Sequence, residues 1–163
     1  MKLDRRTALG AGGAAIAAGF AGLWGTRRSE AAPAHFEYRL TDAQWRAKLT
    51  GPQYATLRQA ATERAGSSPL DHEKRRGVFH CAGCNQSLYS SATKFDSGTG
   101  WPSFFRPLPN AIATREDTAL FMKRTEVHCR RCGGHLGHVF NDGPKPTGLR
   151  YCMNGVAMTF VPA

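Results

Sequence analysis

Two Cys-x-x-Cys pairs constrain this chain more than any other feature of its sequence. The first pair is Cys81 and Cys84 in CAGC, and the second is Cys129 and Cys132 in CRRC. A Cys-x-x-Cys turn lets two thiolates reach one metal ion, and two such turns complete a closed tetrahedral zinc site. Gly133-Gly134, directly after the second pair, supplies the backbone freedom that such a turn needs. We therefore predict one structural zinc ion per chain, bound by these four cysteines.

Other uses of these thiols stay open at this point. Disulfides would suit an oxidising compartment, and a dithiol oxidoreductase using Cys81 and Cys84 would need metal-free thiols. A zinc ribbon that binds nucleic acid or a protein partner, without catalysis, would use the same metal site, because a closed zinc shell carries no chemistry of its own. The formal net charge is +10, but no long Lys/Arg block is present. We therefore expect a solvated basic surface and no nucleic-acid partner.

The first 34 residues have the composition of an export signal. Arg5-Arg6 precede an uncharged run rich in Ala and Gly over 7–26, and Ala32-Pro33-Ala34 fits a small-x-small cleavage site. Paired arginines before such a run indicate twin-arginine export. We expect a signal over 1–34, cleavage next to His35 and a periplasmic protein. A retained, uncleaved membrane anchor that faces the periplasm is the alternative.

The remaining residues, 35–163, suffice for one domain with its own core. Thr41 and Gln44 form a capping box that predicts a helix over 41–49. Gly51-Pro52 breaks that helix and starts another. In this second helix Tyr54, Leu57 and Ala61 fall at helical spacing on one face: this region is predicted to pack rather than to react.

From Gly77 onward the pattern changes to short β-prone runs separated by turns rich in Gly, Pro and Asn. These runs cover 77–81, 87–90, 110–115, 119–124, 125–129, 137–140, 149–153 and 155–161. The predicted fold is mainly β, with antiparallel sheets after short N-terminal helices.

A fifth cysteine, Cys152, has no partner at Cys-x-x-Cys spacing. Side chains alternate along a strand, so Arg150, Cys152 and Asn154 should share one face. A neighbouring guanidinium favours the thiolate and lowers the pKa of a cysteine, which makes it a nucleophile. A buried, inert cysteine is the alternative, but it would have apolar neighbours.

Two other segments carry residues that suit catalysis. His135 and His138 lie three apart in a Gly-rich loop after the second cysteine pair, and either could act as a general acid. Trp101 lies at the tip of a loop between Gly100 and Pro102. An exposed indole there would suit an apolar or methyl-bearing ligand, whereas a buried indole would only pack.

Together these segments resemble the type-B methionine sulfoxide reductases. The resemblance is carried by FDSGTGWPSF (95–104), CGGHLGHVFNDGP (132–144), PTGLRYCMN (146–154) and the two cysteine pairs. It runs from about Leu40 to Phe160. It implies two antiparallel β-sheets with a zinc site away from the catalytic centre. The implied substrate is the R epimer of methionine sulfoxide, mainly in oxidised proteins, and the implied partner is a thioredoxin-like or other thiol reductant.

The resemblance also implies a role for each site residue. Cys152 matches the catalytic cysteine, which attacks the sulfoxide sulfur and becomes a sulfenic acid. His138 would protonate the sulfoxide oxygen, while His135 and Asn154 would hold that oxygen and ordered water. Trp101 matches the tryptophan that holds the substrate methyl group, and Arg150 the arginine close to the thiolate.

One position departs from the family pattern. Many members carry a resolving cysteine where this chain has Thr99, and no sixth cysteine exists elsewhere. The resemblance therefore implies that an external thiol reduces the sulfenic acid directly; attack by a zinc ligand, which would disturb the metal site, is the alternative.

Overall fold

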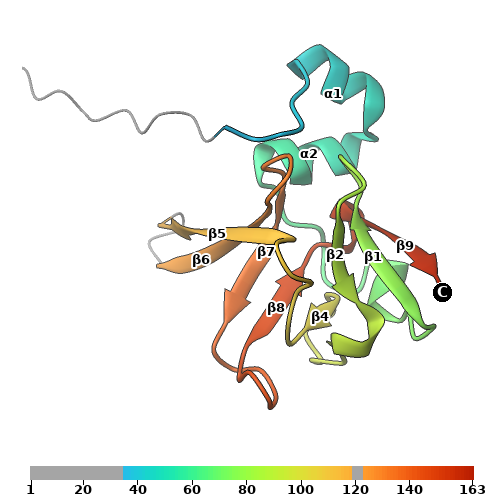
Figure 1. Cartoon of the computed structure of the whole chain (residues 1–163), viewed down its shortest axis with the longest axis vertical. Helices are drawn as coiled ribbons and strands as arrows, with labels where there is room; N and C mark the ends of the chain where they lie inside the picture. Colours follow the sequence, from blue (N-terminus) through green and yellow to red (C-terminus); the bar gives the residue numbers. More distant parts are fainter. Residues whose placement is uncertain (1–34, 119–122) are drawn as a thin grey trace, which may run out of the picture. The chain divides into compact units, whose positions relative to one another are not determined.

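The computed structural model describes residues 35–118 and 123–163 (Figure 1). The predicted export signal, 1–34, lies outside the described residues, as does most of the strand predicted over 119–124. Among the helices of the described part, none is long and apolar enough to cross a membrane.

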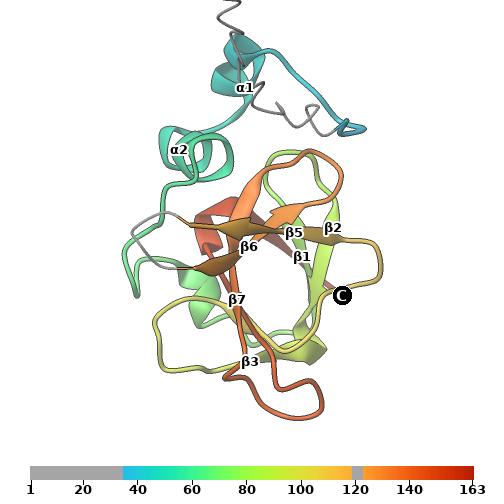
Figure 2. The ribbon, with the colours of Figure 1, turned by 90° about the vertical axis from the view of Figure 1, so that its left-hand side faces the viewer.

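Two short helices open the domain: α1 (Asp42–Lys48) and α2 (Gly51–Gln59). Both begin with a capping box, the first formed by Thr41 with Gln44 as predicted and the second by Thr50 with Gln53. Tyr54 and Leu57 are buried on α2, as predicted. Ala61 is not part of that face, because the helix ends at Ala60 in a left-handed conformation. Figures 1 and 2 both place the helices at one end of the two sheets.

The rest of the described chain forms two antiparallel sheets, which confirms the predicted fold class. The smaller sheet has the order β2-β1-β9, and the larger has the order β3-β4-β8-β7-β6-β5. Their strands are β1 (Gly77–Cys81), β2 (Ser87–Ser90), β3 (Lys94–Phe95), β4 (Ser103–Phe104), β5 (Ile112–Asp117), β6 (Arg124–Cys129), β7 (His135–Phe140), β8 (Arg150–Met153) and β9 (Met158–Pro162). The run predicted as a strand from 155 begins instead as a 3-10 helix, η4 (Gly155–Ala157), before β9.

An aromatic cluster joins the two sheets. Phe79 of β1 and Tyr89 of β2 pack on Phe104 of β4, with ring centroids 4.9 and 4.3 Å apart. All three side chains are fully buried. The hydroxyl of Tyr89 donates a hydrogen bond to the Met153 sulfur over 3.2 Å, which ties the smaller sheet to β8. The core therefore lies against the strand that carries Cys152.

Cys152 occupies a central place in the larger sheet. On β8 it pairs with Ser103 of β4 on one side and with His138 of β7 on the other. Gly137 permits the close approach of β7, because a Cβ there would lie 2.1 Å from the Cys152 carbonyl oxygen. The strand pairing alone therefore places the Ser103 hydroxyl on one side of the Cys152 thiol and the His138 imidazole on the other.

Candidate active site

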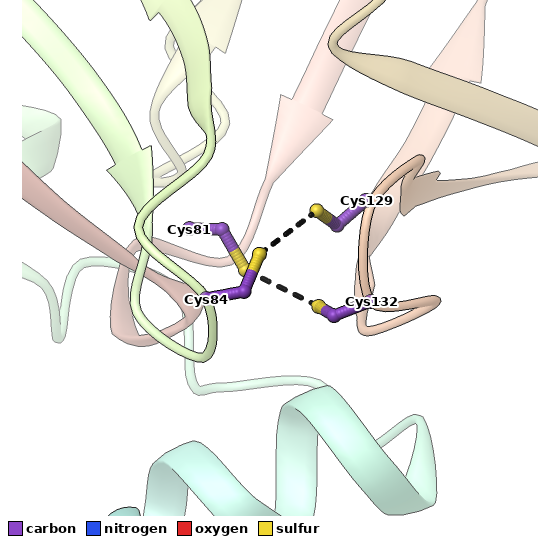
Figure 3. A group of neighbouring side chains, drawn as sticks. All are labelled: Cys81, Cys84, Cys129 and Cys132. Atoms are coloured by element: carbon purple, nitrogen blue, oxygen red, sulfur yellow. Dashed lines mark hydrogen bonds between the residues drawn. The ribbon is translucent and has the colours of Figure 1, made fainter. Parts of the chain in front are cut away.

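The four paired cysteines converge on one point, as predicted. The sulfurs of Cys81 and Cys132 lie 3.7 Å apart and those of Cys84 and Cys129 lie 3.5 Å apart. All four lie within 4.8 Å of one another, and all four residues are buried (Figure 3). A tetrahedral zinc ion with Zn–S bonds of about 2.3 Å has sulfur–sulfur edges of about 3.8 Å. The observed spacing therefore fits a tetrahedral thiolate metal site.

Backbone geometry shapes both cysteine turns. The Asn85 amide donates to the Cys81 carbonyl over 2.8 Å, and the Gly133 amide donates to the Cys129 carbonyl over 2.9 Å. Asn85 and Gly133 both have positive φ, at 60° and 70°, and at Gly133 a Cβ would clash with the Phe36 ring. The first turn follows β1 of the smaller sheet and the second follows β6 of the larger sheet. The cluster therefore links the two sheets.

A separate pocket of 160 Å³ opens beside Cys152. The structure brings four of the predicted site residues to it: Trp101, His138, Cys152 and Asn154. The remaining lining residues, which the sequence reading did not single out, are Thr62, Arg124, Gly137 and Phe140. His135 and Arg150 do not line this pocket.

The Cys152 thiol is half-buried, and its environment differs from the predicted one. Burial raises the pKa of Cys152 above its usual value, and hydrogen bonding to Thr99 and the charge of Arg150 lower it only in part. Arg150 does lower the pKa of Cys152, as predicted, but burial outweighs this effect, so the net shift is upward. The Arg150 guanidinium also forms a two-point ion pair with Asp142 at 2.9 and 2.8 Å and lies over the Phe140 ring.

His138 is held by a charged pair on the neighbouring strands. Its Nε2 lies 2.8 Å from the Asp117 carboxylate, and Arg124 donates to the same oxygen over 2.7 Å. Burial lowers the pKa of His138, and the contact with Asp117 offsets this only in part. Both histidines lie on β7, which begins directly at His135; the β-prone run predicted over 137–140 contained His138 but not His135.

His135 faces a neighbouring polar cavity of 390 Å³ that shares Thr62, Arg124 and His138 with the pocket of Cys152. Its Nδ1 lies 2.8 Å from the Glu126 carboxylate. Burial alone would raise the pKa of Glu126, but His135 and Arg115 hold it at about 2. The Nε2 atom of His135 is buried without a hydrogen-bond partner among the described residues.

Asn154 is more tightly bound to the backbone than its predicted role requires. Its side-chain N–H donates to the Leu136 carbonyl over 3.1 Å, and its side-chain oxygen accepts from the Glu63 amide over 2.9 Å. An amide nitrogen carries two hydrogens. As a donor, Asn154 therefore has one N–H left for a ligand in the pocket.

Glu63 connects the pocket walls, and the sequence reading missed it. Its carbonyl accepts a hydrogen bond from the Trp101 indole over 3.1 Å, which fixes this half-buried ring at the pocket. Its carboxylate accepts from the amides of Gly155 and Val156 at 2.5 and 2.9 Å. No local motif marks Glu63, which lies after α2 in a segment without regular secondary structure.

Comparison with known proteins agrees with this geometry. The SelR domain family model matches residues 49–162. Three similar proteins are each named peptide methionine sulfoxide reductase MsrB. The one from Agrobacterium fabrum is 51% identical over 123 residues, which cover 75% of this chain and 91% of the relative. The one from Methanosarcina barkeri is 53% identical, covering 74% and 85%. The one from Thiobacillus denitrificans is 55% identical, covering 75% and 93%. The chain therefore belongs to the SelR domain family, that of the type-B methionine sulfoxide reductases.

Proposed function

We propose that this protein reduces the R epimer of methionine sulfoxide in oxidised proteins, and so repairs them. One observation carries the proposal: an indole, an imidazole and a thiol, from Trp101, His138 and Cys152, line one pocket of 160 Å³. Pockets for drug-sized ligands usually exceed about 300 Å³. A pocket of this size suits the tip of a side chain, such as a methylsulfinyl group, better than a whole cofactor.

The chemistry begins with a poor electrophile, because the oxygen of a sulfoxide leaves badly. Asp117 holds Nε2 of His138, which leaves Nδ1 to give a proton to the sulfoxide oxygen. The Cys152 thiolate attacks the sulfoxide sulfur. This attack forms an S–S bond; the protonated oxygen then moves from the substrate sulfur to the Cys152 sulfur while the S–S bond breaks, its electron pair leaves on the sulfur of methionine, and Cys152 becomes a sulfenic acid. Because burial favours the neutral forms of both Cys152 and His138, proton transfer from the thiol to the imidazole would create the reactive pair.

The epimer is selected by what surrounds the sulfur. The Trp101 ring would receive the methyl group, since its position is fixed by the bond from its N–H to the Glu63 carbonyl. His138 then defines where the oxygen must point, and Cys152 defines the face that is attacked. In the S epimer, a methyl group against the indole would turn the oxygen away from His138.

Regeneration needs an external reductant. A first thiol displaces water from the sulfenic acid and leaves a mixed disulfide on Cys152, and a second thiol releases the Cys152 thiol and a disulfide. Among the described residues the other cysteines are confined to the buried cluster. A thioredoxin-like protein or a small thiol would supply both thiols.

The metal site supports this function without taking part in it. Cys81, Cys84, Cys129 and Cys132 would hold one zinc ion. A zinc ion with four thiolates has no open position and supplies structural stability only. Every chemical step therefore falls to residues of the pocket.

Turnover of separated epimers tests the proposal. We expect a peptide carrying the R epimer to be reduced with either dithiothreitol or a thioredoxin system, and the S epimer to be untouched. Methionine release is measured by chromatography in both cases. Equal turnover of both epimers would refute the proposed stereospecificity. No turnover of either epimer would refute the proposed function.

We further propose that residues 1–34 direct export to the periplasm by the twin-arginine route. Arg5-Arg6 and the small-residue site at Ala32-Pro33-Ala34 support this proposal. N-terminal sequencing of protein from a periplasmic fraction should begin near His35. An intact N-terminus in the membrane fraction would indicate a retained anchor instead, and one in the cytoplasm would refute export.

A further inference from the structure

Three hydroxyl groups form a chain that ends at the Cys152 sulfur. The Ser103 and Ser97 hydroxyl oxygens lie 2.8 Å apart, and those of Ser97 and Thr99 are also 2.8 Å apart. The Thr99 hydroxyl lies 3.9 Å from the Cys152 sulfur, within hydrogen-bond reach of this large atom. At its other end, Ser103 donates to the Trp101 carbonyl over 3.1 Å.

The local backbone holds these hydroxyls in place. Ser103 is completely buried and pairs with Cys152 across the sheet. The Gly98 amide donates to the Asp96 carboxylate over 2.9 Å, which closes a tight turn around Ser97. On the far side of Thr99, the Gly100 carbonyl accepts a hydrogen bond from the Gly66 amide over 2.7 Å. Backbone hydrogen bonds and strand pairing therefore fix the positions of all three hydroxyl groups.

Each hydroxyl has one proton to give, so the chain has only two consistent directions. With a neutral thiol, the S–H group donates to Thr99, Thr99 donates to Ser97, and the chain continues through Ser103 to the Trp101 carbonyl. With an anionic sulfur, every hydroxyl reverses: Ser103 donates to Ser97 and gives up its bond to the Trp101 carbonyl, Ser97 donates to Thr99, and Thr99 donates to the sulfur. Hydrogen bonds that point the same way polarise and strengthen one another. Either uniform direction is therefore more stable than an arrangement in which the hydroxyls point in mixed directions.

We propose that the hydroxyl chain of Ser103, Ser97 and Thr99 stabilises the anionic forms of Cys152, with Thr99 as the donor to the reacting sulfur. The thiolate before the reaction would receive this bond. So would the sulfenate after it, and this second part rests on the proposed function. Thr99 would thus stabilise the oxidised sulfur until an external thiol arrives.

The electrostatic balance at Cys152 is consistent with this role. Against the burial that raises the pKa of Cys152, hydrogen bonding to Thr99 is the largest lowering influence, ahead of the charge of Arg150 and of hydrogen bonds to Ser103 and Arg150. The other charged or titratable groups that face the pocket are His138 of β7 and Arg124 of β6. Neither contacts Thr99, so a change at Thr99 leaves their effect on the sulfur in place.

The test is the rate of Cys152 alkylation by iodoacetamide as a function of pH, in the zinc-loaded protein. Thr99→Val keeps the branched shape and removes the hydroxyl, whereas Thr99→Ser keeps the hydroxyl and is the matched control. We expect Thr99→Val to be alkylated on the order of tenfold more slowly at pH 7, since a hydrogen bond to a charged group is worth about that factor. The midpoint of its pH curve should move upward, and Thr99→Ser should follow the wild type.

Ser97→Ala adds a test of the chain itself. Removal of the middle hydroxyl should slow alkylation by less than Thr99→Val does, because Thr99 can still donate. If Thr99→Val and the wild type give the same pH curve, the proposal is wrong. If Thr99→Ser is as slow as Thr99→Val, packing rather than hydrogen bonding is responsible, and the proposal is also wrong. Alkylation requires no sulfoxide, so this result is independent of whether the protein reduces methionine sulfoxide.

Discussion

Replacing Cys152 by serine is expected to abolish methionine sulfoxide reduction, with a loss of at least about a thousandfold, as for other enzymes that lose their nucleophile. A serine hydroxyl is a far weaker nucleophile than a thiolate, and its oxygen cannot take up the sulfoxide oxygen as a sulfenic acid. Folding should be unaffected. The substitution keeps nearly the same shape at a half-buried position, and Cys152 is not one of the four cysteines of the metal cluster.

Two measurements on the same preparations check this expectation. Initial rates of methionine release report activity, and zinc content per chain reports the integrity of the cluster. The wild type, given R sulfoxide without a reductant, should release about one methionine per chain and then form a dimedone adduct on Cys152. His138→Asn is a graded comparison, because it removes the proton donor and keeps the nucleophile. A Cys152→Ser protein with full activity would refute the mechanism.

The sequence alone predicted the fold class and the cysteine cluster because both depend on local patterns. Cys-x-x-Cys spacing already restricts the geometry of each turn, and the register of β1 and β6 needs only to bring the two turns together. The helix starts were equally local, since Thr41 and Gln44 cap α1 without any distant partner. The prediction that Ala61 lies on the buried face of α2 was wrong, because Ala60 adopts a left-handed conformation and ends the helix. An alanine does not indicate such a conformation in a sequence.

The electrostatics of the site were not predictable in the same way. Strand alternation suggests that Arg150 acts on Cys152, but it does not reveal Asp142, which lies eight residues away and takes both ends of the guanidinium. Nor does it measure burial, which here outweighs the neighbouring cation and reverses the direction of the pKa shift. The charge of Arg150 and the desolvation of the thiol shift the pKa of Cys152 in opposite directions, so only the structure shows which effect is larger.

The two histidines illustrate a third limit. Residues three apart in a regular strand point to opposite faces, which would separate His135 from His138. A register shift between Val127 and His128 of β6 interrupts the pairing with β7. The two imidazole rings lie 5.4 Å apart, edge to face. Gly137, an isolated glycine within β7, is the one sequence signal of this irregularity, but only the structure shows how His135 and His138 lie beside one another.

Loss of the metal is expected to have the largest effect on stability. The two cysteine turns join the smaller sheet, through β1, to the larger sheet, through β6. Structural zinc sites contribute about 10–16 kcal/mol of apparent binding energy, and whole domains are stable by only about 5–15 kcal/mol. Cys132→Ser, or removal of zinc by a strong chelator, should therefore leave the chain largely unfolded at room temperature.

Thermal unfolding followed by circular dichroism measures this effect, and released zinc is quantified in parallel. Cys152→Ser is the matched control, because it also removes one thiol but leaves the cluster whole. It should melt at the wild-type temperature and lose its structure on chelation as the wild type does. The Arg58 and Arg131 side chains also reach across the turns, donating to the Cys132 and Cys84 carbonyls. If the chelated wild type melted at an unchanged temperature, these hydrogen bonds and the aromatic core would suffice to hold the sheets, and a structural role for the metal would be refuted.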